Sequence, residues 1–278
     1  MYSKYHGIGV FSLAFAAILL AAQTCAAMEF VAVGDPGNSP DTRYDATGYG
    51  AVAHEYSIGK YEVTAGQYRD FLNAAAATDV YGLYNSGMDS DTYGCQITQT
   101  GSSGSYTYDF SGAPSGTVAD WENRPVNYVS WYDAARYANY LTTGNTENGA
   151  YTLTGPTTVS SIMDHQTAAT IYGTVYVIPT ENEWYKAAYY DGSTGTYYDY
   201  PTGSNSAPGY VNNSGNLSGT STPFADGVTD PGNYATYDGD GDPNGVGSPY
   251  YRTNVGEWEA SASPYGTFDQ GGNVWEWN

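Results

Sequence analysis

The sequence predicts a loop-rich fold with short helices and strands, and its composition is the main reason. Only 13% of the 278 residues are charged, about half the usual share, while the chain holds 35 glycines and 31 tyrosines. The 41% of hydrophobic residues is enough to bury a core. Uncharged polar residues and glycine must therefore form most of the surface, which favours turns and loops over a helix bundle.

Residues 1–27 have the features of a secretory signal peptide. Lys4 provides a basic start, an apolar run over residues 8–22 follows, and small residues allow cleavage after Ala27. The apolar run is too short to span a bilayer, and no later stretch is long enough to do so. Lipidation of Cys25 is the alternative, but the three residues before it form a poor lipobox. We therefore expect a secreted or periplasmic protein without a membrane segment after cleavage, whose mature domain covers residues 28–278.

Three segments of the mature chain carry helical patterns with one apolar face each. The first follows the capping residue Thr64. The second and third follow Ser130 and Thr180, and each of these caps has an acidic residue three positions later, as in a capping box. We expect the second helix to end at Gly144 and the third at Gly192.

Strands are less distinct in the sequence. The best candidates are residues 55–63 and 174–178, which are rich in Tyr, Val and Ile. From residue 192 to 247 the chain is almost entirely Gly, Ser, Thr, Asn, Pro, Asp and Tyr, which predicts a long irregular region. A loop of this length within a compact domain usually serves a function or is held in place by other groups.

The formal net charge of −21 narrows the classes of partner. It argues against nucleic acid, since phosphates are bound by Lys and Arg, and against anionic membrane surfaces. It suits cations. One acidic run, residues 237–242, has three carboxylates two residues apart, and it can be either a loop around a hard cation or a solvated turn.

The cysteines and histidines give little support to catalysis. Signal cleavage leaves Cys95 as the only cysteine, so no internal disulfide can form, and a small buried residue is a better interpretation than a nucleophile. His54 and His165 lie far apart without a metal-ligand spacing, so we predict no histidine cluster. Serine-hydrolase elbows and P-loops are absent from the sequence.

The last ten residues contain a second candidate cation site. Asp269 and Glu276 flank a pair of glycines, which allows backbone carbonyls to turn inward beside two carboxylates, and Ca²⁺ prefers such oxygen ligands. Trp275 and Trp277 alternate around Glu276, as in a core strand packed on both faces. From these residues alone, the core strand is the favoured interpretation.

Four blocks of the chain resemble, in order, those of the formylglycine-generating enzyme (sulfatase-modifying factor) family. They are Ile-Gly-Lys-Tyr-Glu-Val-Thr at 58–64, Arg-Pro-Val-Asn-Tyr-Val-Ser-Trp at 124–131, Pro-Thr-Glu-Asn-Glu-Trp-Tyr-Lys-Ala-Ala at 179–188 and Gly-Asn-Val-Trp-Glu-Trp at 272–277. The resemblance covers the chain from about Val33 to Asn278. It implies the compact α+β variant of the C-type-lectin-like fold.

The resemblance also implies Ca²⁺ at two places. At the first, the family pattern matches the Asp269 side chain, the Gly272 and Val274 carbonyls and the Glu276 carboxylate. At the second, it matches the Asn233 side chain and the Tyr234 carbonyl, but the family's carboxylate falls at Gly247. Aspartates of the 237–242 run could substitute there.

Family members oxidise a sulfatase cysteine to formylglycine with copper held by a cysteine pair downstream of the Trp-Glu-Trp block. This sequence reaches only Asn278, so we interpret it as a domain truncated at its C-terminus, and expect copper only if a missing segment carries the pair. The favoured function is a non-catalytic domain that binds a protein or carbohydrate ligand through Tyr- and Gly-rich loops. The alternative is the copper-dependent oxidase in a full-length parent. Related sulfoxide synthases hold iron with histidines, a pattern that we do not find in this sequence.

Overall fold

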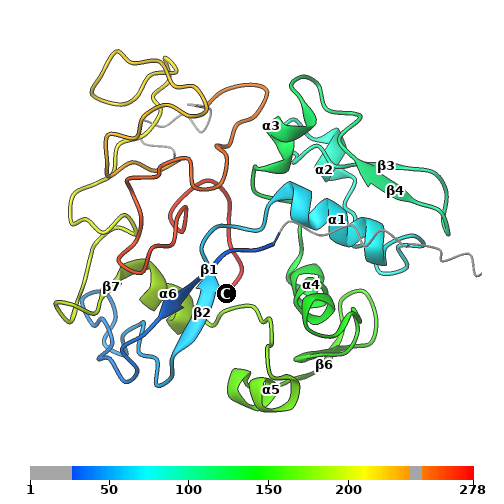
Figure 1. Ribbon diagram of the computed structural model, residues 1–278, viewed down its shortest axis with the longest axis horizontal. Coiled ribbons are helices and arrows are strands. Elements are labelled where there is room, and N and C mark those ends of the chain that lie inside the picture. Colours follow the sequence, from blue (N-terminus) through cyan, green and yellow to red (C-terminus); the bar gives the residue numbers. More distant parts are fainter. Residues whose placement is uncertain (1–26, 238–245) are drawn as a thin grey trace, which may run out of the picture.

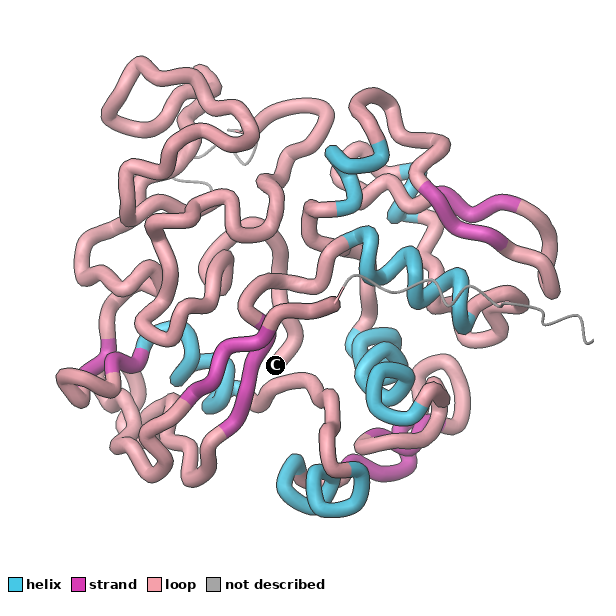
Figure 2. Tube along the Cα trace, in the orientation of Figure 1, coloured by secondary structure: helices cyan, strands magenta, loops and turns pink. Residues whose placement is uncertain are grey.

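Short helices and strands are separated by long loops throughout the protein (Figures 1 and 2). The computed structural model describes residues 27–237 and 246–278. Within these residues the helices are α1 (Ala65–Ala75), α2 (Gly87–Ser90), α3 (Val118–Glu122), α4 (Trp131–Thr143), α5 (His165–Tyr172) and α6 (Glu181–Tyr189). The strands are β1 (Phe30–Val33), β2 (Tyr56–Gly59), β3 (Thr98–Thr100), β4 (Thr107–Asp109), β5 (Tyr151–Leu153), β6 (Val159–Ile162), β7 (Tyr190–Asp191) and β8 (Thr196–Tyr197).

The strands form antiparallel pairs and no larger sheet within the described residues. The pairs are β1–β2, β3–β4, β5–β6 and β7–β8. Strands β1 and β2 come from segments more than twenty residues apart and lie near the middle of the molecule (Figure 1). This mixture of helices and separate strand pairs is an α+β arrangement, as the sequence predicts.

The three predicted helices are present, and their predicted caps are confirmed. Thr64, Ser130 and Thr180 each accept a hydrogen bond from the backbone three residues later, in complete capping boxes. Gly144 closes α4 in the left-handed conformation. The predicted end of α6 at Gly192 is wrong, because Tyr190 is already extended and starts the β7–β8 pair.

Helix α5 and the segment after it differ from the sequence prediction. Asp164 caps α5, which the sequence analysis missed because Thr and Ile residues obscure its apolar stripe. The strand predicted at 174–178 is absent. Its backbone N–H groups are bound by side chains instead: Tyr176 donates to the Thr142 hydroxyl (2.9 Å), and Ile178 donates to the Tyr151 hydroxyl (2.8 Å).

Three groups of buried apolar residues form the core. The largest surrounds α1, where Tyr68 and Phe71 pack against Tyr137 of α4. A second joins α4, β5 and α5. The third centres on Trp258 and Tyr234, in the loop-rich half of the molecule. The loop-rich half contains few helices and strands, so its apolar contacts come mainly from large aromatic side chains.

Tyrosine hydroxyls replace many of the missing sheet hydrogen bonds. Several tyrosines, three of the following four buried, donate to backbone carbonyls of distant loops at 2.6–2.8 Å. These pairs are Tyr68 with Leu83, Tyr108 with Ala76, Tyr234 with Ser218, and Tyr237 with Pro208. One residue type therefore fills the core and satisfies carbonyls that no ladder reaches.

Among the described residues, every helix is too short or too polar to cross a membrane.

Candidate metal centre

The loop before the last residues is folded back tightly around Gly272. Gly272 has φ 125°, and a Cβ there would lie 2.1 Å from the Thr236 carbonyl oxygen, so only glycine fits. The next residue, Asn273, donates its backbone N–H to the same carbonyl at 2.7 Å. Its side-chain oxygen accepts the Thr253 N–H at 3.1 Å. These contacts place the backbone on either side of Gly272 in the protein interior.

This loop brings Asp269 and Glu276 into the interior from opposite ends. Asp269 Oδ2 accepts the Gly256 N–H at 2.6 Å, and Glu276 accepts a hydrogen bond from the Trp184 indole N–H of α6. Part of each residue is accessible, yet burial of the carboxyl group raises the pKa of Asp269 to about 6 and that of Glu276 to about 7. Two carboxyl groups are thus held where their charges are poorly solvated.

Glu62 is a third interior carboxylate, and the sequence analysis did not include it. Its Oε2 accepts a hydrogen bond from the Asn273 side chain at 3.0 Å, while its Oε1 is buried without a partner in the described residues. Burial, and then the charges of Asp269 and Glu276, raise the pKa of Glu62 well above its usual range. The sequence did contain a signal for this residue. Glu62 lies in the predicted strand at residues 55–63, and a carboxylate buried in such a strand requires a partner.

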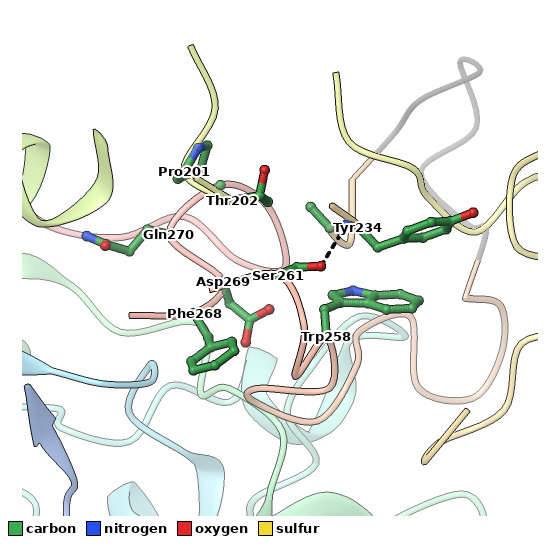
Figure 3. Close-up of a pocket in the computed structure, with 10 residues that line it drawn as sticks. Pro201, Thr202, Tyr234, Trp258, Ser261, Phe268, Asp269 and Gln270 are labelled. Carbon is green, nitrogen blue, oxygen red and sulfur yellow. Dashed lines mark hydrogen bonds between the residues drawn. The ribbon is translucent and has the colours of Figure 1, made fainter. Parts of the chain in front are cut away.

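A small cavity is lined in part by Asp269. Figure 3 shows the Asp269 carboxylate between Phe268 and Trp258, with Tyr234 nearby. The dashed line marks the hydrogen bond from the Tyr234 N–H to the Ser261 hydroxyl (2.8 Å). One residue from each predicted calcium site, Asp269 from the first and Tyr234 from the second, thus lines the same cavity.

At the second predicted calcium site, the side chain that should bind the metal is already engaged in hydrogen bonds. The Asn233 side-chain oxygen accepts from Thr202 Oγ1 at 2.6 Å, and its amide donates to two loop carbonyls. Tyr234 packs its ring on Trp258. The aspartates of the 237–242 run that were expected to assist, Asp238, Asp240 and Asp242, lie outside the described residues.

The core strand favoured for residues 275–277 is wrong. Trp275 is fully exposed and Trp277 is half-exposed, and neither belongs to a strand. The Trp277 indole donates to the Val129 carbonyl at 2.9 Å. The Glu276 carboxylate is held inward by its hydrogen bond from the Trp184 indole, while the Trp275 ring is exposed.

The family of the chain follows from comparison with known proteins. The family model for the sulfatase-modifying factor enzyme 1-like domain matches residues 21–278. The chain belongs to this family. Searches of curated proteins and of solved structures each gave no match.

In this sulfatase-modifying factor-like domain, the two mature-chain histidines share one carboxylate. His54 Nε2 lies 2.9 Å from Glu183 Oε1, and His165 Nδ1 lies 3.0 Å from Oε2. Burial would raise the pKa of Glu183, but hydrogen bonds from His165, Thr180 and His54 outweigh it and lower the pKa to about 2. The fold thus brings His54 and His165 together at Glu183 although they are distant in sequence, but in the described part of the chain these side chains do not form a group that could hold a metal ion.

The cysteine of the sulfatase-modifying factor-like domain lies in the core. Cys95 is fully buried beside α1 and α2, and burial raises the pKa of its thiol. This confirms the interpretation of Cys95 as a small buried residue. A neutral, enclosed thiol is poorly suited to nucleophilic or metal chemistry.

Proposed function

We propose that this member of the family is an exported calcium-binding domain with the C-type-lectin-like fold, and that it binds a protein or carbohydrate ligand without catalysing a reaction. The observation that carries the proposal is the group of interior carboxylates at Asp269, Glu276 and Glu62. None of the ion pairs in the described part of the chain reaches them. Interior carboxylates that form no ion pair favour either protonation or a bound cation.

The donor set suits Ca²⁺ when carbonyl oxygens are included. No three His, Cys, Asp or Glu side chains in the described ranges gather closely enough to hold a metal ion by themselves. The proposed ligands are therefore the carboxylates of Asp269 and Glu276 with the carbonyls of Gly272 and Val274, which are hard oxygen donors. Bound Ca²⁺ would supply the positive charge that holds residues 269–276 in place. The carboxylate of Glu62, whose Oε1 has no hydrogen-bond partner in the described residues, would add to the negative electrostatic potential at this site.

Calcium binding is tested by calorimetric titration of chelator-treated protein with CaCl₂. We expect saturable binding, and we expect Glu276→Gln to weaken it strongly, because a neutral amide replaces a charged ligand. The matched control is Glu259→Gln, an exposed glutamate outside the loop, which should bind like the unaltered protein. Equal loss in both variants, or no binding by the unaltered protein, would refute the site.

The copper-dependent oxidase does not fit the described residues. Copper in that role requires soft thiolate ligands, and the thiol available here, Cys95, is enclosed in the core with a raised pKa. Cys95 itself is therefore a poor ligand for copper.

Export is the second part of the proposal, and it rests on the basic, apolar and small-residue pattern of residues 1–27. When the gene is expressed in a bacterial host with a secretory pathway, we expect the exported protein to begin near residue 28. Mass spectrometry of its N-terminus measures this directly. Exported material that retains Met1 would contradict the proposal.

A further inference from the structure

Two histidines and one glutamate join three separate segments of the chain. His54 belongs to the segment before β2, His165 is the first residue of α5, and Glu183 lies in the first turn of α6. His54 Nε2 lies 2.9 Å from Glu183 Oε1, and His165 Nδ1 lies 3.1 Å from Oε1 and 3.0 Å from Oε2. A single buried carboxylate therefore connects the start of α5 and the approach to β2 with α6.

The capping box of α6 positions this carboxylate. Glu183 Oε2 accepts hydrogen bonds from the backbone N–H of Thr180 at 2.8 Å and from its hydroxyl at 2.9 Å. The Tyr56 hydroxyl donates to the Glu183 backbone carbonyl at 2.5 Å. Because the pKa of Glu183 is lowered to about 2, the carboxylate stays ionised throughout the range from pH about 5 to 8 in which histidines change their charge.

Helix α5 is held to the rest of the protein by few other contacts. Of its eight residues, all described, only Ala168 is buried. At its far end the Tyr172 hydroxyl donates to the Gly149 carbonyl at 3.2 Å. The helix lies at the lower edge of the molecule in Figure 1. A short helix that buries so little apolar surface has a low local stability, so its contact with Glu183 decides how firmly it is held.

The elements packed against the cluster contribute further titratable groups. These are Glu55 and Tyr56 next to His54, Asp164 next to His165, Tyr151 of β5 and Lys186 of α6. The carboxylates of Glu55 and Asp164 add negative potential near the imidazoles, and Asp164 offsets the helix dipole at the start of α5. The two phenols stay neutral, because burial and the charge of Glu183 raise their pKa values. Lys186 binds elsewhere, since its Nζ donates to the Asp35 carbonyl at 2.8 Å.

We propose that His54, Glu183 and His165 form a proton-dependent clamp, which holds α5 and the segment before β2 against α6 in mildly acidic medium and loosens α5 as the pH rises. At higher pH the neutral imidazoles donate ordinary N–H hydrogen bonds to the carboxylate. A proton on each ring keeps these contacts and adds the attraction of opposite charges in a partly buried site.

Both partners determine the pH at which the clamp is strongest. The attraction of the imidazolium groups is present at low pH and is lost as the pH rises above about 7. The pKa of Glu183 falls from 4.5 to about 2 on folding, so its contribution is present above pH 4.5 and is lost as the pH falls toward 2. The clamp is therefore strongest near pH about 5–6.

The test is amide hydrogen exchange of α5, measured in chelator and corrected for the intrinsic pH dependence of exchange. Between pH about 7.5 and pH about 5.5 we expect the protection of α5 amides to rise about tenfold, as for one added charge pair. Amides of α4 are the internal reference, because a change in global stability alters their exchange as well. Equal protection of α5 at the two pH values, or a rise that α4 shares in full, would overturn the proposal.

Two independent variants remove the charges while keeping the hydrogen bonds. Glu183→Gln retains the helix cap, since Gln67 occupies the same capping-box position in α1. In the double variant His54→Gln, His165→Asn, each amide places an N–H donor near the original ring nitrogen but cannot be protonated. We expect either variant to abolish the rise in protection of α5.

The matched control is Glu181→Gln, an exposed glutamate in the same turn of α6, which should keep the rise. A rise that persists in Glu183→Gln or in the histidine double variant would contradict the clamp. Because Asp269 and Glu276 are unchanged in all of these variants, their protonation contributes equally throughout. The measurement contains neither calcium nor a ligand, so its outcome is independent of the proposed function.

Discussion

Saturating calcium at pH about 7.5 should raise the melting temperature of this protein by about 5–10 °C, and at pH about 5 most of this increase should disappear. A 100-fold excess over Kd adds about 2.7 kcal/mol to the free energy of unfolding, which corresponds to such a shift for a domain of this size. The pKa values of about 6 for Asp269 and about 7 for Glu276 mean that both carboxyl groups are protonated at the lower pH. Calcium must then displace two protons.

Without calcium, the stability of the protein should increase as the pH falls, whereas the stabilisation by calcium decreases. The folded protein holds protons at Asp269 and Glu276 that the unfolded chain, with ordinary values of 3.8 and 4.5, has already released. These groups therefore stabilise the metal-free protein least above pH about 7, and stability rises as the pH falls toward 5. Because both residues are partly accessible, the combined effect is on the order of 2–3 kcal/mol.

Thermal denaturation between pH about 5 and 8, with chelator or with CaCl₂, measures both trends. The double variant Asp269→Asn, Glu276→Gln should flatten them. A calcium-induced shift of the same size at both ends of the pH range would contradict the prediction.

Arg124→Met should lower the free energy of unfolding by about 3–5 kcal/mol and the melting temperature by roughly 10 °C. Arg124 is fully buried, and its guanidinium donates to the carbonyls of Asp120 and Arg252 and pairs with Asp226. It also lies 3.9 Å from the centre of the Tyr250 ring. Methionine fills part of the space but leaves these acceptors without a donor.

The matched control is Lys60→Met, which removes a partly exposed cation paired with Glu29 at 3.1 Å. Surface pairs contribute less than about 1 kcal/mol, so its melting temperature should change by only a few degrees. Denaturation by urea gives the free energies for both variants. If Arg124→Met were no more destabilising than Lys60→Met, the guanidinium would not be holding these three segments together.

Local signals in the sequence were sufficient for the helix caps, whereas the candidate metal centre was expected from the family resemblance, because the residues alone favoured a core strand. Each capping box involves residues three positions apart. Such patterns are readable because the interacting groups lie within one turn of chain. The same holds for the left-handed end of α4 at Gly144.

The remaining features depend on contacts between distant segments. Glu62 meets Asn273 across 211 positions, and Trp184 meets Glu276 across 92, so no local spacing indicates either contact. His54 joins Glu183 across 129 positions. The missing strand at 174–178 has the same cause, since the hydroxyls that bind its backbone belong to α4 and β5.

The tyrosine hydroxyls that bind loop carbonyls have a consequence for how this chain can change over generations. In most folds the backbone of a sheet is satisfied by its neighbours, whatever side chains it carries. Here, the carbonyls of Leu83 and Ala76 depend on Tyr68 and Tyr108. Even the mild replacement of either tyrosine by phenylalanine leaves a buried acceptor unmet. Loops usually tolerate many substitutions. Here, single positions are constrained, because one tyrosine hydroxyl at each position must bind a loop carbonyl.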